Sequence, residues 1–409
     1  MLNASRCFKN GTPIMLFSGK TKPVESLTKK DSVIGLDGKP KKIIKIHEGS
    51  DQLYKVSQTN GDDYVVNGNH ILVLKFTNVE GIYWDNSRER YKARYIQDLK
   101  IHDKSFPCDR DKYGDITDKT VETTYGYADN FLLCKSNEEG YNKGGDILEI
   151  SVKDYLKLPA NMKRILYGFK QEVNFKERSV DLDPYLLGLW LGDGTTLEAC
   201  ITNIDQEIID YIYDYAKENN LRVTKKGSCG YYIAGTESGK GNNSFLNQLK
   251  HYNLIGNKHI PIDYLMNSRE TRLQVLAGLM DSDGYLNKNM YEICQLSDKL
   301  AVDIVKLARS LGFRVGHTKR KKTCVKKDAS NVTKLYNVML ISGCNISDVP
   351  CLLKRKRAKA CGKDVDFLIT QIKVEKDEVD DYTGFQIEGD GKFFGQDYTV
   401  LHNSTVVED

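Results

Sequence analysis

The sequence has no long apolar run, and its cysteines are not paired in any metal-binding spacing. No stretch approaches the roughly 18–20 apolar residues of a membrane-spanning helix, and the start, MLNASRCFKNGTP, lacks the apolar core of a signal peptide. Ten cysteines are scattered over 409 residues without one Cys-x-x-Cys pair, which indicates neither a zinc site nor a disulfide framework. We therefore expect an intracellular protein of the nucleus or cytoplasm, away from membranes, whose thiols stay reduced.

A large excess of positive charge is also missing, although basic residues are clustered. The formal net charge is only +4, which does not by itself indicate a nucleic-acid partner. Six Lys or Arg and no acid stand in HTKRKKTCVKK (317–327), and five stand in KRKRAK (354–359). The stretch YWDNSRERYKARY (83–95) mixes four basic with four aromatic residues. One such run is usually a solvated face, but three favour a polyanion partner, because Lys and Arg release counterions from phosphates.

The length and the pattern of the chain indicate several domains. One compact core rarely accommodates 409 residues. Residues 7–75 read as short strands separated by Gly, Asn and Asp turns, and β-like patterning returns in 381–403. The region 76–178 shows no clear period. The β material at the two ends could pair into one domain, with the middle of the chain inserted in it.

The middle of the chain contains an internal repeat. PYLLGLWLGDGTT (184–196) is similar to LAGLMDSDGYL (276–286). The segments that follow, 201–223 and 293–315, also align and share several identical residues. A repeat of about 90 residues predicts two similar halves related by a pseudo-two-fold axis.

Each repeat begins with a Leu-rich helix that contains small residues and ends in Asp-Gly. Gly188 and Gly278 would let the two helices pack closely, and Asp193 and Asp283 would then emerge together. Like charges at close range need a cation, and oxygen ligands near a phosphate suit Mg²⁺ or Mn²⁺. A core helix that simply ends in Asp-Gly would explain one copy. Two copies at matching positions favour a paired metal site.

The two motifs, LLGLWLGDG and LAGLMDSDG, closely resemble the LAGLIDADG motifs of homing endonucleases. Their order is similar to that of the yeast vacuolar-ATPase intein endonuclease. The resemblance implies an α+β domain of two pseudo-symmetric αββαββα halves, in which Asp193 and Asp283 bind the catalytic metals. The lysine of NKHIP, Lys258, matches a catalytic lysine of the family, and the other half would supply Lys354 or Lys356.

The same resemblance gives the basic runs a role in DNA recognition. The family lays antiparallel strands in the major groove, which implies a long, asymmetric site on double-stranded DNA and a monomeric protein. The region 76–178 could be an elaboration for DNA recognition. Within it, the patch 83–95 is either a second DNA contact or a folded hairpin without a DNA role. The candidate DNA contacts are Arg88, Arg90, Lys92, Arg94, Lys319, Arg320, Lys321, Lys322, Lys354 and Lys356.

The beginning of the chain resembles the N-terminal splice junction of an intein. CFKNGTPIMLFSG opens with Cys7, and VVNGNHILVL places His70 in the second splicing motif, with Asn67 where the family usually has Thr. The resemblance implies that the Cys7 sulfur attacks the carbonyl of Arg6. His70 would protonate the departing amide nitrogen, and Asn67 could hold the oxyanion.

The end of the chain resembles the C-terminal splice junction. His402, Asn403 and Ser404 are ordinary turn residues when taken alone. Together with Cys7 and His70 they match an intein terminus. Ser404 would then be the second nucleophile, and Asn403 would cyclise with help from His402. Splicing of this kind needs no cofactor.

The resemblance divides the chain into an all-β Hint splicing domain, an inserted endonuclease and two flanks from a host protein. The Hint domain would comprise 7–178 and 366–403, and the endonuclease 179–365. The flanks, or exteins, would be 1–6 and 404–409.

Two positions depart from the usual pattern before the C-terminal junction, where Gly384 and Lys392 replace an Asp and a His. Their effect on the splicing rate stays open. Two further readings also remain. One is a free-standing endonuclease with a decayed splicing domain, and the other is a DNA-binding regulator or maturase that does not cleave.

Overall fold

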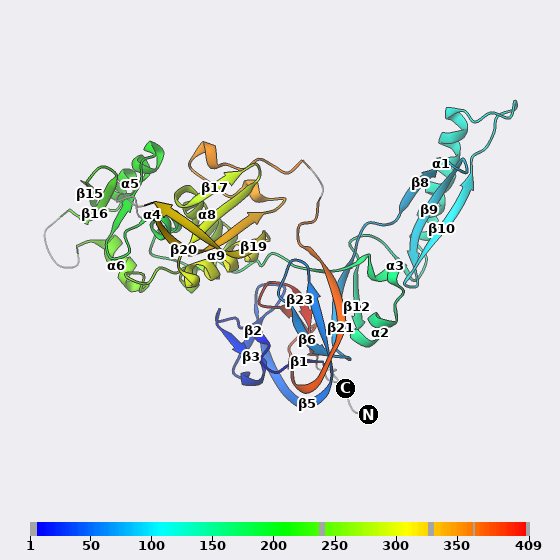
Figure 1. Cartoon of the computed structure of the whole chain (residues 1–409), viewed down its shortest axis with the longest axis horizontal. Coiled ribbons are helices and arrows are strands. Elements are labelled where there is room, and N and C mark those ends of the chain that lie inside the picture. The colour runs from blue at the N-terminus through cyan, green and yellow to red at the C-terminus, as the bar shows by residue number, and fades with distance from the viewer. Residues whose placement is uncertain (1–5, 237–241, 326–330, 363–364, 406–409) are drawn as a thin grey trace.

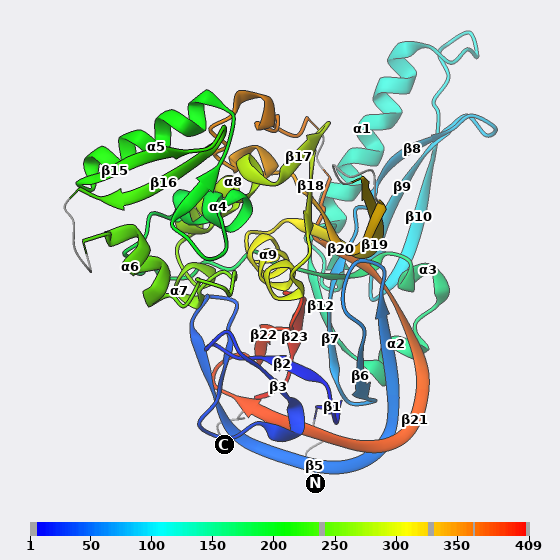
Figure 2. The same cartoon turned by 60° about the vertical axis from the view of Figure 1, so that its left-hand side comes forward.

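The computed structural model describes residues 6–236, 242–325, 331–362 and 365–405. Figure 1 shows a β-rich domain that holds both ends of the chain, an α/β domain on the left and a slender arm on the right. The turned view in Figure 2 again shows the arm and the α/β domain rising from the same side of the β-rich domain. Within the described ranges, no helix is both long enough and apolar enough to cross a membrane.

The β-rich domain is built around two long strands, β5 (Pro40–Gln58) and β21 (Ile369–Ile387). They pair antiparallel along most of their length. The sheet follows the order β12-β7-β13-β21-β1-β6-β5-β4, and β24 also pairs with β21. The β material of the two chain ends therefore shares one sheet, as the sequence pattern predicted. The other bounds are β1 (Cys7–Lys9), β4 (Ser32–Ile34), β6 (Tyr64–Asn67), β7 (Ile71–Phe76), β12 (Ile147–Ser151), β13 (Leu166–Phe169) and β24 (Ser404–Thr405).

Aromatic side chains fill the core of this domain, because alternate strand residues point inward. Phe8, Phe385 and Phe393 are fully buried, with ring centroids 5.4–6.3 Å apart. Burial of each ring contributes about 1.5–3 kcal/mol. The hairpin of β22 (Lys392–Phe394) and β23 (Val400–His402) packs Phe393 and Leu401 into the same core, and Phe394 and Val400 into a smaller neighbouring cluster. Smaller elements are β2 (Pro13–Met15), β3 (Thr21–Pro23), η1 (Val24–Ser26), α2 (Val152–Lys157) and α3 (Ala160–Lys163).

The arm is inserted between β7 and β12, which are neighbours in the sheet. A helix covers one face of its small antiparallel sheet, where Tyr91 and Tyr95 contact rings of α1 at centroid distances of 5.5 and 5.6 Å. Because successive strand residues face opposite sides, Arg90, Lys92 and Arg94 line the uncovered face. The bounds are β8 (Gly81–Asp85), β9 (Arg90–Gln97), β10 (Lys100–Pro107), β11 (Tyr141–Asn142) and α1 (Asp118–Lys135).

The α/β domain consists of two halves. The first half runs α4, β14, α5, β15, β16 and α6, and the second runs α8, β17, β18, α9, β19 and β20, with α7 between them. The sheet orders are β14-β16-β15 and β17-β18-β20-β19. The bounds are α4 (Pro184–Asp193), β14 (Cys200–Thr202), α5 (Gln206–Glu218), β15 (Leu221–Lys226), β16 (Gly230–Gly235), α6 (Ser244–His251), α7 (Ile262–Leu265), α8 (Arg269–Ser282), β17 (Gly284–Asn287), β18 (Met290–Gln295), α9 (Asp298–Ser310), β19 (Arg314–Val325) and β20 (Asn331–Ser342).

The halves differ from the expected αββαββα order in two places. The first half has one strand fewer before α5, because residues 195–199 form a tight turn in which the Thr195 N–H donates to the Cys200 carbonyl at 2.8 Å. A single bridge between Gly194 and Ile201 stands where a strand pair was expected. The second half ends in the 3-10 turns η2 (Ile346–Asp348) and η3 (Lys354–Lys356) in place of a final α-helix.

The helices α4 and α8 approach each other through their glycines. A Cβ atom on Gly188 would lie 2.3 Å from the carbonyl oxygen of Val275, and one on Gly278 would lie 2.2 Å from that of Tyr185. No side chain fits at these distances, so the two backbones are in direct contact. The close packing that the small residues predicted is therefore confirmed.

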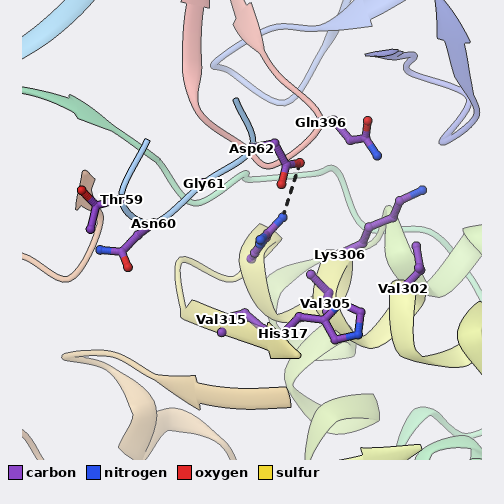
Figure 3. A pocket seen from close by; sticks show the side chains of 12 residues that line it. Thr59, Asn60, Gly61, Asp62, Val302, Val305, Lys306, Val315, His317 and Gln396 are labelled. Atoms are coloured by element: carbon purple, nitrogen blue, oxygen red, sulfur yellow. Dashed lines mark ion pairs between the residues drawn. The ribbon is translucent and has the colours of Figure 1, made fainter. Parts of the chain in front are cut away.

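A polar junction joins the α/β domain to the β-rich domain. Figure 3 shows a pocket of about 430 Å³, in which Asp62 of the loop after β5 faces α9, the helix that carries Val302, Val305 and Lys306. Across this junction, Asp62 lies 3.9 Å from the guanidinium of Arg309. The two domains thus meet through charged side chains as well as through packing.

Candidate active sites

The two repeat carboxylates occupy matching places in the α/β domain. Asp193 is the last residue of α4, and Asp283 caps the C-terminal end of α8. The side-chain amide of Asn203 donates to Asp193 Oδ2 at 2.8 Å, and that of Gln295 donates to Asp283 Oδ2 at 2.7 Å. These amides stand at equivalent positions of the sequence repeat, so the same device orients each carboxylate.

The electrostatics of this pair favour a bound cation. Burial, together with the negative charge of Asp283, raises the pKa of Asp193 to about 6. Within the described part of the chain, no three His, Cys, Asp or Glu side chains gather in a metal-binding group. A divalent ion held by Asp193 and Asp283 would therefore take its other ligands from phosphate or water, which suits Mg²⁺ and similar hard cations.

One lysine accompanies each carboxylate. Lys258 Nζ donates to three carbonyls at the C-terminal end of α4, at 2.7–3.3 Å. Lys356 Nζ donates to three carbonyls at the C-terminal end of α8, at 2.9–3.1 Å. Burial lowers the pKa of Lys258 to about 8 and also lowers the pKa of Lys356. Lys354 makes no such contact among the described residues, so Lys356 is the counterpart of Lys258.

Part of the basic run on β19 is already neutralised. Lys319 Nζ lies 2.9 Å from Asp298, and Lys322 Nζ lies 3.4 Å from Glu292. Arg320 and Lys321 are exposed on the same strand. The strand therefore presents positive charge to solvent, but less than its sequence suggests.

In the arm, an even larger share of the basic side chains is paired with acidic residues. Arg90 and Lys92 lie 3.3 and 2.9 Å from Asp85. Arg94 forms two hydrogen bonds with Asp103, at 2.8 and 2.9 Å. Arg88 is exposed at the β8–β9 turn and has no acidic partner among the described residues. Arg88 is therefore the clearest candidate of the four for a phosphate contact.

A second cluster surrounds the Arg6–Cys7 peptide bond. Cys7 is fully buried in β1, and its N–H donates to Asn67 Oδ1 at 3.2 Å. His70 is also fully buried, with its ring centroid 4.7 Å from that of Phe8. Burial lowers the pKa of His70 to about 3, with smaller contributions from the nearby His402 and Arg6, so its imidazole is neutral. Asn67 thus contacts the amide nitrogen of this peptide bond.

Gly384 directly faces the Cys7 thiol. The two residues are partners in the β1–β21 register. A Cβ atom on Gly384 would lie 2.5 Å from Cys7 Sγ and 2.8 Å from the carbonyl oxygen of Arg6. The departure from Asp noted in the sequence therefore leaves space for both the sulfur and the carbonyl.

The C-terminal residues are held by partners that sequence reasoning missed. His402 Nε2 lies 3.4 Å from Glu149, and Arg6 Nη1 lies 2.9 Å from His402 Nδ1. Lys392, the cross-strand partner of His402, lies 2.6 Å from Glu149. Neither Arg6 nor Glu149 belongs to a motif. The only sequence signal for Glu149 was Lys392, because a lysine at a position where the family has a histidine suggests an acidic partner nearby.

Both ends of the 7–403 segment meet on one edge of β21. Cys7 pairs with Gly384, and Ser404 pairs with Gln386. Because β5 occupies the other edge over this stretch, β1 and β24 follow each other on the same side, about 7 Å apart along the strand. Ser404 is described only by its backbone. The Asn403 N–H donates to the Gly391 carbonyl at 2.8 Å, which fixes the turn before it.

Comparisons with known proteins match both parts of the chain. Residues 7–122 match a family described as the homing-endonuclease-associated Hint domain, and residues 259–362 match the homing endonuclease family. Solved structures of the homing endonuclease I-DmoI align with 39% of this chain and 82% of their own at 16% identity and a TM-score of 0.24. The complex of I-DmoI with DNA and Mn aligns with 39% and 88%, at 17% identity and a TM-score of 0.24.

Two curated relatives are longer than this chain. The replicative DNA helicase DnaB of Mycobacterium intracellulare is 32% identical over 161 residues, which are 39% of this chain and 24% of the helicase. The catalytic subunit of the V-type proton ATPase of Candida tropicalis is 22% identical over 493 residues, which are 97% of this chain and 43% of the ATPase chain. This chain therefore spans less than half the length of either relative. The two matches place a homing-endonuclease-associated Hint domain and a homing endonuclease domain in one chain, a combination that fits an intein carrying a homing endonuclease.

Proposed function

We propose that residues 7–403 excise themselves, join the flanking host segments, and also cleave double-stranded DNA at a specific site. The observation that carries the splicing half is the meeting of both junctions on one edge of β21. The observation that carries the cleavage half is the matched pair of carboxylates, each with its own amide and lysine. A decayed splicing domain is disfavoured because Cys7, His70 and Asn403 are all present.

The first splicing step is an acyl shift. Cys7 Sγ attacks the carbonyl carbon of Arg6, a C–S bond forms, and the C–N bond to Cys7 breaks, with a proton taken up by the released amine. The Asn67 contact fixes the amide nitrogen, and the space beside Gly384 admits the sulfur. His70 would supply the proton through a ring N–H, since its imidazole stays neutral before the reaction.

The later steps use the C-terminal junction. Ser404 Oγ attacks the thioester carbonyl and releases the Cys7 thiol, which gives a branched ester. Asn403 Nδ2 then attacks its own carbonyl carbon, closes a succinimide and releases the amine of Ser404, which takes a proton delivered by His402. The freed amine attacks the ester carbonyl, so that an amide replaces the ester and restores the Ser404 hydroxyl.

For DNA cleavage we assign the metal ligands to Asp193 and Asp283. A divalent ion there, Mg²⁺ or Mn²⁺, would activate water and neutralise charge on the scissile phosphate. Asp193 and Asp283 would hold it through one carboxylate from each half of a pseudo-symmetric domain, although the first half has one strand fewer. Lys258 and Lys356, each beside one carboxylate, would stabilise the negative charge that develops on phosphate.

The DNA would lie along the strands of the α/β domain. Arg320 and Lys321 on β19 are suited to phosphate or groove contacts, because their charges face solvent. The arm would add a second contact through Arg88, and a monomer would cover a long asymmetric site because its two halves differ in sequence. Lys319 and Lys322 would have to release acidic partners before they could join the interface.

We further propose the boundaries of the functional parts. The splicing domain comprises 7–178 and 366–403, the endonuclease 179–365, and the host segments 1–6 and 404–409. The pairing of β21 with β1 and β5 supports this division. Action in the nucleus would follow from cleavage of chromosomal DNA.

Intact-mass measurement over time, on the chain placed between two reporter proteins, tests the splicing half. We expect a free product of residues 7–403 and a joined reporter, both lost in the Cys7→Ala, Asn403→Ala double variant. The same preparation, incubated with a DNA library and Mg²⁺, tests the nuclease half. A persistent full-length mass would remove splicing from the function, and uncut DNA would remove cleavage.

A further inference from the structure

We infer that Arg6, the last residue before the splicing segment, restrains His402 until the first acyl transfer and so sets the order of the two cleavages. The inference rests on the proposed splicing function and goes beyond it. It makes the host residue at this position a determinant of splicing fidelity, and it assigns Glu149 the opposing role.

The restraint is visible in the contacts of one guanidinium. Arg6 Nη1 lies 2.9 Å from His402 Nδ1 and donates to the carbonyl oxygen of Asn403 at 3.3 Å. The carboxylate of Glu149 lies 3.4 Å from His402 Nε2. His402 is only 4% exposed, so the imidazole is enclosed between these two partners.

Arg6 meets the imidazole as a cation close to both ring nitrogens. Its Nη1 lies 2.9 Å from His402 Nδ1 and 3.4 Å from His402 Nε2. A guanidinium has donors only, so Arg6 disfavours a second proton on the ring while it stays in place. It thereby opposes the imidazolium that would protonate the departing amine of Ser404.

The charges around His402 act in the same sense. Burial lowers the pKa of His402, and the positive charges of Arg6 and Lys392 lower it further, whereas Glu149 and a hydrogen bond with the Asn403 backbone raise it. His70, the other ionisable ring in the cluster, is neutral because of its burial. Arg6 thus opposes the imidazolium that could serve as the proton donor, and Glu149 favours it.

Acyl transfer removes this restraint. The Arg6 carbonyl moves from the nitrogen of Cys7 to its sulfur and then to the oxygen of Ser404, so the guanidinium loses its precursor position. The imidazole of His402 is then open to protonation, with Glu149 as the charged group that favours it. Release of the C-terminal host segment would therefore follow transfer of the N-terminal one, and the two segments would not be lost separately.

The test measures C-terminal cleavage alone. In a Cys7→Ala precursor the acyl shift cannot occur, and cleavage between Asn403 and Ser404 is followed by intact mass. We expect Arg6→Ala to accelerate this cleavage about tenfold or more, and Arg6→Lys to keep part of the restraint. The control is Arg222→Ala, on β15 of the α/β domain. Equal rates for the Cys7→Ala parent, its Arg6→Ala derivative and the control would overturn the inference.

The pH profile separates restraint from a general loosening of the junction. Because Arg6→Ala removes a positive charge, the fall of the cleavage rate with rising pH should move to higher pH. Glu149→Gln should move it to lower pH. A loosened junction would change the rate equally at all pH values, and that result would contradict the proposed role.

The outcomes also distinguish this inference from the proposed function. A wild-type precursor that splices, with Arg6→Ala leaving C-terminal cleavage unchanged, overturns the restraint alone. A wild-type precursor that never splices, with no C-terminal cleavage in any variant, overturns the splicing function and the restraint with it.

Discussion

At the residue scale, the splicing centre depends on an absent side chain. Cys7, the proposed nucleophile, and the carbonyl of Arg6 occupy the volume that a side chain on Gly384 would fill. A residue that is larger by one carbon must displace backbone as well as the sulfur. The glycine therefore leaves room for the reacting atoms to meet. The absence of a side chain matters here, and the backbone freedom of glycine does not.

Gly384→Ala should slow thioester formation. Its methyl group would lie 2.8 Å from the Arg6 carbonyl oxygen, which is backbone and cannot rotate away. We expect at least about a tenfold loss, or roughly 1.4 kcal/mol of barrier, in thiol-induced cleavage of an Asn403→Ala precursor. Gly316→Ala on β19, where the nearest atom is 4.0 Å away, should splice normally. A Gly384→Ala precursor that reacts at the wild-type rate would refute the steric argument.

The paired carboxylates predict a pH-dependent metal requirement. The pKa of Asp193 is raised to about 6 by its burial and by Asp283, so below this pH a proton competes with the cation. The Mg²⁺ concentration for half-maximal DNA cleavage should therefore rise as pH falls below 6, by up to about tenfold per unit. Measurement between pH 5 and pH 8 checks this. A requirement that is flat through pH 6 would contradict it.

The assignment of Lys356 to the nuclease site can be tested against Lys354, which lies in the same short turn. Lys356→Met should lower DNA cleavage strongly, by about 10²-fold or more, because it removes the cation at the end of α8. Lys354→Met, two residues away, should leave the cleavage rate nearly unchanged. Single-turnover kinetics on supercoiled DNA at saturating Mg²⁺ measures both. Equal losses would mean that the turn acts through bulk charge.

At the element scale, the nuclease site depends on direct contact between two helices. The aspartates to which we assign metal binding stand at the ends of α4 and α8, so the separation of the carboxylates follows from the separation of the backbones. Gly188 and Gly278 set that separation. A substitution in the middle of either helix should therefore change the separation of the two carboxylates.

Gly188→Ala should destabilise the α/β domain by about 1–3 kcal/mol or more, because its methyl group overlaps the Val275 carbonyl. Gly126→Ala is the control, since this glycine lies inside α1 with no atom within 4 Å. It should be neutral or stabilising by about 0.5–1 kcal/mol. In a Trp84→Phe background, the fluorescence of Trp190 in α4 follows unfolding of this domain by urea. Equal midpoints for Gly188→Ala and its parent would contradict the contact.

The sequence predicted those elements that leave a recognisable pattern in their own stretch of the chain. The repeat predicted the two helices, the glycine contact and the matching aspartates, and the alternating pattern predicted the shared sheet. The helix of the arm escaped prediction because α1 packs on a small sheet and buries only Thr124 and Ala128, which leaves little apolar periodicity. Glu149 and Arg6 escaped because each meets His402 only after distant strands have come together.

At the scale of the whole molecule, the arm and the α/β domain rise from the same side of the β-rich domain in both Figure 1 and Figure 2. A long DNA duplex that follows the strands of the α/β domain would therefore have the arm within the same half of the protein. The arm's usable charge is small, since three of its four basic candidates are paired with Asp85 or Asp103.

Salt dependence of DNA binding tests this arrangement. Arg88→Ala should reduce the slope of log affinity against log salt concentration by about 0.9, the value for one lost phosphate contact. Arg94→Ala should change the slope less, because Asp103 already compensates that charge. Fluorescence anisotropy with Ca²⁺, over a series of salt concentrations, measures both. Unchanged slopes in both variants would assign the arm to a structural role.

The pairing of β5 with β21 also determines when the protein can become active during its synthesis. The ribosome makes β5 early, but the arm and the whole α/β domain must follow before β21 emerges to join it. Until β21 is available, β5 carries Lys41, Lys42 and Lys45. Their charges disfavour pairing of the strand with another chain. The catalytic centre for splicing is therefore the last part of the nascent chain to assemble. The junction at Cys7 is thus protected from cleavage until most of the 7–403 segment has been synthesised.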